Sequence, residues 1–258
     1  MPLNIAGTVV RSSFLAGLPN SGIVTRGLVL NLDAGNIASY SGSGTVAYSL
    51  TGTYITGTHI ANLNNGTTYS TANGGEFSFD GTNDQIVVPS SSNFNLFNTD
   101  YAIEIAIFLN SSESSSNKYN TAIYVPSAPL IIGFARSGLV SGVPFIYTAQ
   151  GGIPGFASTN YSPYTYPGTE YNPAGKWTII TLTKLGSIDY IYINGTQYAT
   201  KTWAGTISNS SSVVELGFNS TYQEYLAGKI GSTRIYNRGL TAQEVAQNFN
   251  STRNRFGV

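Results

Sequence analysis

Short runs of β-branched and aromatic residues, separated by turn-forming residues, recur from residue 27 to residue 236 and constrain the fold most strongly. In the run from residue 101 to residue 109, Ile103, Ile105 and Ile107 alternate with smaller residues and with Glu104. A period of two places the isoleucines on one face of a β-strand. Many such strands at short intervals predict a β-sandwich or a β-barrel.

The turn residues between the runs set the expected element boundaries. Asn194-Gly195 supplies the two positive φ angles of a type I′ hairpin turn. Thr241 and Glu244 form a capping box that predicts one helix over residues 242–250. We expect an all-β, antiparallel fold with this one short C-terminal helix. The expected strands cover residues 27–33, 46–48, 54–60, 77–79, 85–88, 101–109, 121–125, 130–135, 145–147, 176–183, 188–193, 196–203, 213–218 and 229–236.

Charged residues make up only 9% of the 258 residues, and 12 Lys and Arg balance 12 Asp and Glu. An average soluble chain has about 25% charged residues. A balanced charge provides no electrostatic attraction for nucleic acid or an anionic membrane, so we expect neither as a partner. The chain has no cysteine, which excludes disulfides and cysteine-based zinc sites.

The chain divides into two unequal parts. Residues 1–26 are small, apolar and interrupted by Gly and Ser, and two interpretations stand: a flexible tail, or an arm that docks on a neighbouring subunit. Residues 27–258 form one predicted domain. The apolar runs near the N-terminus are too broken for a secretory signal, and no run is long enough for a membrane span.

Five motifs in order resemble the concanavalin A-like lectin/glucanase (laminin G-like) family. They are GLVLNLDAG at 27–35, FSFDGTND at 77–84, GKW at 175–177, IYING at 191–195 and GKIGSTRIYNRGLT at 228–241. The ending QNFNSTRNRFG at 247–257 is similar to the versions found in structural proteins of tailed phages. The resemblance implies an antiparallel jelly-roll sandwich. The family usually has an acidic residue directly after the position of Ile230, whereas Gly231 and Ser232 follow it here.

The sequence argues against catalysis. A retaining glycosidase needs two carboxyl groups about 5–5.5 Å apart, and residues i and i+2 of a strand share a face. No predicted strand carries such a pair, and Glu104 is isolated among apolar residues, which predicts an edge-facing or outward charge. His59, the one histidine, has no local Ser and acid partners for a triad. We expect no enzymatic activity.

Asp80, Asn83 and Asp84 form a short oxygen-rich loop, and Asp33 is a candidate fourth ligand. Calcium takes six to eight oxygen ligands, so these four residues are a candidate calcium site. The alternative is turn chemistry, because Asp and Asn side chains bind their own backbone in tight loops. The missing acid after Ile230 weakens the calcium interpretation.

Two tyrosine-rich segments are candidates for contact with carbohydrate or a protein partner, since tyrosine gives a large contact area with few rotatable bonds. Packing within the loops and between subunits is the alternative for both segments. Trp177 and Trp203 lie within predicted strands, which places them in the core. The candidates are Tyr161, Tyr164, Tyr166 and Tyr171 with Asn160 and Asn172 in residues 138–175, and Tyr222 and Tyr225 in residues 219–226.

The resemblance implies a virion structural protein: a capsid-decorating or tail-fibre module, assembled in the host cytoplasm and released by lysis. The expected partners are other virion proteins, bound through residues 1–26 or the segment after Phe249, further copies of the chain in a homo-oligomer, and surface glycans. The alternatives are a free or cell-surface carbohydrate-binding lectin or adhesin and, least favoured, a glycoside hydrolase.

Overall fold

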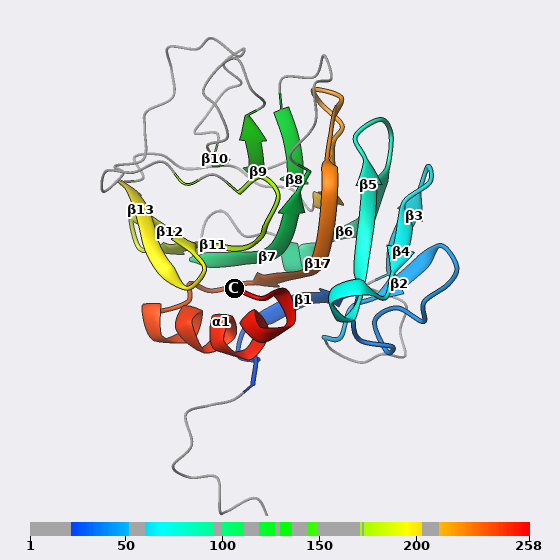
Figure 1. Ribbon diagram of the computed structural model, residues 1–258. Helices are drawn as coiled ribbons and strands as arrows, with labels where there is room; N and C mark the ends of the chain where they lie inside the picture. Colours follow the sequence, from blue (N-terminus) through cyan, green and yellow to red (C-terminus); the bar gives the residue numbers. More distant parts are fainter. Residues whose placement is uncertain are drawn as a thin grey trace, which may run out of the picture.

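The computed structural model describes residues 22–51, 60–94, 100–110, 119–126, 130–135, 144–148, 171, 173–202 and 212–258. Within these residues two antiparallel sheets stack face to face, and one α-helix lies against the outer face of one sheet (Figure 1). The predicted all-β sandwich with a C-terminal helix is confirmed.

Sheet A has eight strands in the order β13-β12-β11-β7-β17-β5-β4, with β1 also paired to β17. Its strands are β1 (Leu28–Asp33), β4 (Thr68–Ser70), β5 (Glu76–Asp80), β7 (Tyr101–Leu109), β11 (Trp177–Leu185), β12 (Ile188–Ile193), β13 (Thr196–Thr202) and β17 (Ala227–Tyr236).

Sheet B has seven strands in the order β10-β9-β8-β14-β6-β3-β2. They are β2 (Val46–Tyr48), β3 (Ile60–Asn64), β6 (Gln85–Ser91), β8 (Tyr119–Val125), β9 (Leu130–Ala135), β10 (Pro144–Thr148) and β14 (Ser212–Leu216). A separate small hairpin joins β15 (Phe218–Asn219) to β16 (Glu224–Tyr225), and two 3-10 turns, η2 (Ala72–Gly74) and η3 (Ser92–Phe94), complete the assignment.

The core lies between the sheets and follows the predicted alternation. Ile103, Ile105 and Ile107 of β7 are fully buried there, in one cluster with residues of sheet B such as Ile86 and Ile123. The predicted turn between β12 and β13 is also present, with φ of 48° at Asn194 and 73° at Gly195. The predicted strand at 54–60 lies outside the described residues except for Ile60, where β3 begins.

The helix α1 (Ala242–Phe256) starts at the predicted capping box but is six residues longer than predicted. Thr252 is held by its hydroxyl, which donates to the Asn248 carbonyl at 2.6 Å. Phe256 is buried against Trp177, with ring centroids 4.6 Å apart. These contacts extend the helix to a left-handed C-cap at Gly257.

The helix closes the outer face of sheet A with small apolar clusters. One contains Val24, Tyr236 and Val245, and another contains Trp177 and Phe256. Trp177 is therefore buried as predicted, but beneath α1 rather than between the sheets, while Trp203 lies outside the described residues.

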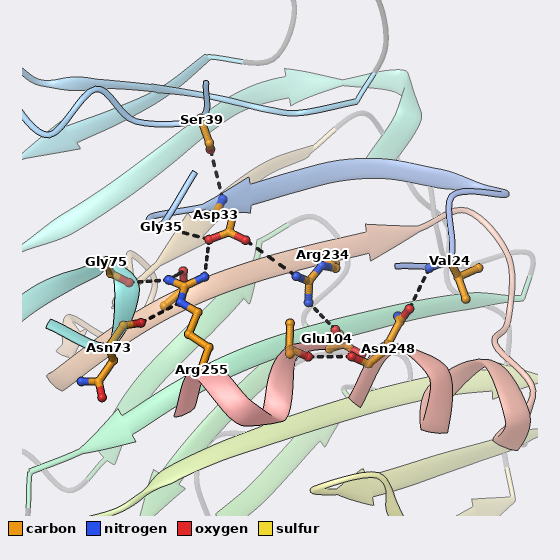
Figure 2. A network of polar contacts seen from close by, with 12 residues as sticks. Val24, Asp33, Gly35, Ser39, Asn73, Gly75, Glu104, Arg234, Asn248 and Arg255 are labelled. Carbon is orange, nitrogen blue, oxygen red and sulfur yellow. Dashed lines mark hydrogen bonds and ion pairs between the residues drawn. The ribbon is translucent and has the colours of Figure 1, made fainter. Parts of the chain in front are cut away.

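Part of the predicted N-terminal arm packs with α1 on the outer face of sheet A. The Val24 amide donates to Asn248 Oδ1 at 2.9 Å (Figure 2). Gln247 Nε2 donates to the Gly22 carbonyl at 2.8 Å. Residues 22–26 thus lie along α1, whereas residues 1–21 lie outside the described residues. The predicted boundary at residue 26 stays a prediction. No helix in the described ranges has the length and apolar character needed to cross a membrane.

Candidate functional site

The outer face of sheet B is the large sheet face that α1 leaves uncovered. Among the described residues, the hairpin of β15 and β16 packs against β8 of this sheet. Core residues alternate with outer ones along each strand, as Ala61 and Leu63 do with Asn62 and Asn64 on β3. One row of directly opposed residues crosses this face from β9 to β2: Ile131, Tyr124, Glu215, Val87, Asn62 and Val46.

The half of this face formed by β6, β3 and β2 is rich in amide side chains. Asn62, Asn64 and Gln85 are each partly exposed, and Asn64 is directly opposite Gln85. Tyr48 of β2 lies on the same face with 45% of its surface exposed. Amides can both donate and accept hydrogen bonds, and an aromatic ring offers a flat apolar surface. This combination can bind a sugar ring and its hydroxyls.

The hairpin of residues 218–225 holds Tyr222 and Tyr225, two of the predicted contact residues. Tyr225 stacks on Phe218 with ring centroids 4.9 Å apart. Asn219 Oδ1 accepts the Thr221 and Tyr222 amides at 3.1 and 3.2 Å, which fixes the turn. Tyr124 of β8 joins the hairpin to the sheet through a 2.7 Å hydrogen bond between its hydroxyl and the Thr221 hydroxyl.

Two buried carboxyl groups belong to this hairpin and to the strand before it, Glu224 of β16 and Glu215 of β14. Glu215 Oε2 accepts the Ser220 amide at 2.9 Å, and Glu224 Oε2 accepts the Thr121 hydroxyl and Asn219 Nδ2, both at 3.3 Å. Burial raises the pKa of Glu224 to about 7 and also raises the pKa of Glu215, because a buried carboxylate loses its hydration.

The other predicted tyrosines do not join this site in the described structure. Tyr171 lies beside sheet A, where its hydroxyl bonds to the Thr178 hydroxyl at 2.9 Å and its amide donates to the Tyr198 hydroxyl at 3.1 Å. Tyr171 therefore lies beside sheet A, whereas Tyr222 and Tyr225 lie in the hairpin of residues 218–225. The remaining predicted residues, Tyr161, Tyr164, Tyr166, Asn160 and Asn172, lie outside the described residues, as does His59.

A family model described as the concanavalin A-like lectin/glucanases superfamily matches residues 80–246, more than half of the chain. The chain belongs to this superfamily. No curated protein sequence matches it.

Several solved structures have a fold similar to that of this chain, at low sequence identity. A Trypanosoma rangeli sialidase matches with a TM-score of 0.59 and 15% identity over 89% of this chain and 33% of the sialidase chain. The binding domain of botulinum neurotoxin DC in complex with SialylT gives a TM-score of 0.61 and 16% identity over 88% of this chain and 52% of that chain.

Domain 4 of AbnA, a GH43 extracellular arabinanase from Geobacillus stearothermophilus, was solved in complex with arabinotriose. It gives a TM-score of 0.58 and 19% identity, and the match covers 87% of this chain and 99% of the domain. The chain thus spans about a third of the sialidase but nearly all of this arabinanase domain.

The four predicted calcium ligands do not come together in this concanavalin A-like sandwich. Asp33 pairs with Ser232 and Asp80 pairs with Ala227, five positions away on β17. At about 3.3 Å per residue, this separates them by roughly 16 Å. No group of three or more His, Cys, Asp or Glu that could hold a metal occurs within the described residues.

The Asp33 carboxylate is instead bound by arginine (Figure 2). Arg255 Nη1 of α1 binds Asp33 Oδ1, and Arg234 Nη2 lies 3.9 Å from Asp33 Oδ2. Gly231, which follows Ile230 where an acid is usual, makes room for the end of the helix. A Cβ at this position would lie 2.4 Å from the Phe256 ring. A guanidinium therefore neutralises Asp33, and Asp33 does not fit a calcium site.

Asp80 and Asp84 do lie together, with their carboxylates turned to the backbone. Asp84 Oδ2 accepts the Asp80 amide at 2.9 Å, and Asp80 Oδ1 accepts the Thr82 amide at 2.7 Å. Asn83 takes part through its carbonyl, which accepts Asn65 Nδ2 at 3.2 Å. These contacts match the alternative considered from the sequence, in which Asp and Asn side chains bind their own backbone in a tight loop. Calcium binding at this loop stays a prediction.

The prediction that Glu104 is an edge-facing or outward charge was partly wrong. It lies on the outer face of sheet A as its alternation predicts, but it is 1% exposed rather than a solvent-facing charge. Its Oε1 accepts Arg234 Nη1 at 2.6 Å, and its Oε2 accepts the Thr181 hydroxyl at 3.3 Å. The helix above it excludes water, and the buried arginine compensates its charge (Figure 2).

Proposed function

We propose that this chain is a lectin-like carbohydrate-binding module whose glycan contacts lie on the outer face of sheet B. The observation that carries the proposal is that Asn62, Asn64 and Gln85 share with Tyr48 the sheet face that α1 leaves open. The similar folds include a neurotoxin binding domain in complex with SialylT and an arabinanase domain in complex with arabinotriose, which supports a role in glycan binding.

A glycan array tests this proposal. The full chain is expected to bind a subset of oligosaccharides, and Asn62→Ala with Asn64→Ala is expected to weaken that binding at least about tenfold, because two hydrogen-bonding amides are lost. Gln243→Ala, which removes an exposed amide on α1, is the matched control and should leave binding unchanged. Silence on the array, or equal loss in the control, would contradict the proposal.

We propose binding rather than hydrolysis as the activity. The feature that favours a hydrolase is the presence of two buried carboxyl groups, Glu215 and Glu224, near one hairpin. Their hydrogen bonds go to groups of the protein itself, and both side chains are buried. Release of reducing sugar from β-glucan or arabinan, abolished by Glu224→Gln, would support the hydrolase instead.

We also propose that the module is a virion structural protein, bound to neighbouring virion proteins or copies of itself through its N-terminal segment or C-terminal end. The hydrogen bonds of Gly22 and Val24 to α1 support this, because they hold residues 22–26 on the side of sheet A, opposite the outer face of sheet B. Mass spectrometry of purified particles should find the chain at a fixed copy number. Its absence from particles would contradict the virion role and leave glycan binding unaffected.

A further inference from the structure

One amide on the outer face of sheet B lies among aliphatic side chains. Asn62 of β3 is directly opposite Val46 of β2 on one side and Val87 of β6 on the other. Ile60 is two positions earlier on β3 and therefore shares this face. All four residues are partly exposed, so a molecule bound here meets polar and apolar groups together. Directly opposed side chains have Cβ atoms about 5 Å apart, so the two valines flank Asn62 closely.

The amide side chains of this face differ from buried ones in their hydrogen bonds. Asn248, beneath α1, binds other groups of the protein through both ends of its amide. Within the described part of the chain, the side-chain amides of Asn62, Asn64 and Gln85 make no hydrogen bond to another group of the protein. Their donors and acceptors are therefore available to a ligand. A ligand that covers them without bonding to them loses affinity, because the amides give up their bonds to water.

The spacing of Asn62 and Asn64 suits a secondary amide group on the ligand. Both side chains lie on the outer face of β3, and two steps along a strand cover about 6.5–7 Å. The N–H and C=O of a trans amide point in opposite directions, so an amide placed between the two asparagines reaches one of them with each group. The two carbon substituents of that amide then point across the strands, toward β2 on one side and toward β6 on the other.

The two sides of this position differ in the space that they leave. Toward β6, Val87 and Gln85 are both directly opposite residues of β3. Toward β2, no strand residue is opposite Asn64, because β2 begins at Val46. A Cβ added at Gly44, just before β2, would meet no described atom within 4 Å. The larger substituent of a bound amide therefore fits toward β2, and a methyl group fits toward Val87.

We propose that this position is a subsite for the acetamido group of a 2-acetamido sugar. Asn62 and Asn64 bind the N–H and the C=O of that group, Val87 contacts its methyl, and the sugar ring extends toward β2. The inference rests on the proposed function and names the ligand class of the same site. A hydroxyl group at C2 of the sugar replaces one of these hydrogen bonds but leaves Val87 uncovered, so sugars without an acetamido group bind more weakly.

Calorimetric titration of the full chain with pairs of oligosaccharides tests this inference. The members of a pair differ only at C2, as N-acetylglucosamine-terminated and glucose-terminated oligomers do, or N-acetylgalactosamine-terminated and galactose-terminated ones. The acetamido member is expected to bind at least about tenfold more tightly. An N-formyl analogue of the same sugar lacks only the methyl group, and its affinity should be about fourfold lower than that of the N-acetyl sugar.

Val87→Thr replaces one methyl group of Val87 by a hydroxyl group and keeps a β-branched side chain that suits a strand. It should reduce the affinity ratio between the N-acetyl and N-formyl sugars to less than about twofold. Val213→Thr is the matched control, since Val213 is also partly exposed but lies on β14, on the other side of β6 from the asparagines. This control should leave the ratio unchanged.

Three results would overturn the inference. Equal affinities for the two members of every pair would refute the acetamido subsite and leave the proposed function intact, and an unchanged ratio in Val87→Thr would refute the methyl contact. Binding to no glycan would refute the proposed function itself. If Val87→Thr does not fold, as judged by circular dichroism, the wild-type ratio between the N-acetyl and N-formyl sugars decides, and a ratio of one would refute the methyl contact.

Discussion

At the scale of single residues, the described structure contains a buried pair of opposite charges. Glu104 and Arg234 are 1% and 2% exposed and form one ion pair beneath α1. Removing one member of a buried pair leaves the other charge without compensation, which costs about 3–5 kcal/mol.

Glu104→Ala is therefore expected to lower the free energy of unfolding by about 3–5 kcal/mol in urea denaturation. Asp100→Asn is a suitable control, because Asp100 is 41% exposed and its pair with Lys184 lies near the surface. We expect less than about 1 kcal/mol for this control. Similar losses in the two variants would show that Glu104 and Arg234 do not act as a buried pair.

Glu224 makes stability depend on pH in the sense opposite to that of an ordinary surface acid. Its pKa is raised to about 7 in the folded chain, so folding favours the protonated form. The contribution of Glu224 to the free energy of unfolding is fully present below the pKa of the unfolded state. It is lost as pH rises through the pKa of the folded state. Between pH 5 and pH 8 this loss amounts to about 2–3 kcal/mol.

Glu224→Gln should remove this part of the pH dependence, so that the variant gains stability relative to the wild-type chain as pH rises from 5 to 8. Urea unfolding of both proteins at each pH measures the difference, and the other titrating groups cancel in the comparison. Glu244, whose pKa is lowered to about 2 by Arg238, titrates below this range. A difference that does not change with pH would contradict the burial of an ionisable Glu224.

At the scale of elements, α1 joins the two ends of the described structure. Asn248 is fully buried, and its side chain binds both the Val24 amide and the Tyr236 hydroxyl, each at 2.9 Å. Arg255 at the far end of the helix binds Asp33 and the Asn73 carbonyl (Figure 2). The helix therefore fixes the N-terminal segment and the edge of sheet A together.

Asn248→Ala should cost about 2–3 kcal/mol, since two buried polar groups lose their partner. Hydrogen exchange at the Val24 amide should accelerate more than exchange in β7. Gln247→Ala, which removes the single bond to the Gly22 carbonyl at the exposed side of α1, should have a much smaller effect. Unchanged protection of Val24 in Asn248→Ala would show that the segment is held by other contacts.

The sequence predicted most of the strands and the start of α1 because these depend on local signals, but it did not predict β4 or the part of β3 after Ile60. Alternation identified β7, Asn-Gly identified the turn after β12, and the capping box identified Thr241 as the N-cap. The end of α1 could not be predicted in this way. Asn250, Ser251 and Thr252 have poor helix propensity, and the contact of Phe256 with Trp177 overrides it.

The candidate site was less predictable than the fold. Asn62 and Asn64 alternate with Ala61 and Leu63, so a local signal for an amide-bearing sheet face did exist and was missed. The buried position of Glu224 had no such signal. Thr121 and Glu224 are separated by 103 positions in the chain, and only the folding of the hairpin over β8 brings them together.

At the scale of the whole molecule, the described N-terminal residues belong to the folded unit. Val24 is 7% exposed, and the Arg26 carbonyl accepts Arg238 Nε at 2.9 Å. A chain that begins at Leu28 should lose at least about 2 kcal/mol relative to a chain that begins at Gly22, because it lacks one buried valine and its hydrogen bonds. Thermal unfolding of the two truncated chains measures this, and equal midpoints would place the folded unit after residue 27.

The contacts between α1 and the described N-terminal residues also bear on how the molecule can be immobilised. Gly22 and Val24 bond to α1 on the outer side of sheet A, whereas Asn62 and Asn64 lie on the outer face of sheet B. A chain that begins at Gly22 and is coupled to a solid support through that residue should therefore turn its amide-bearing face to the solvent.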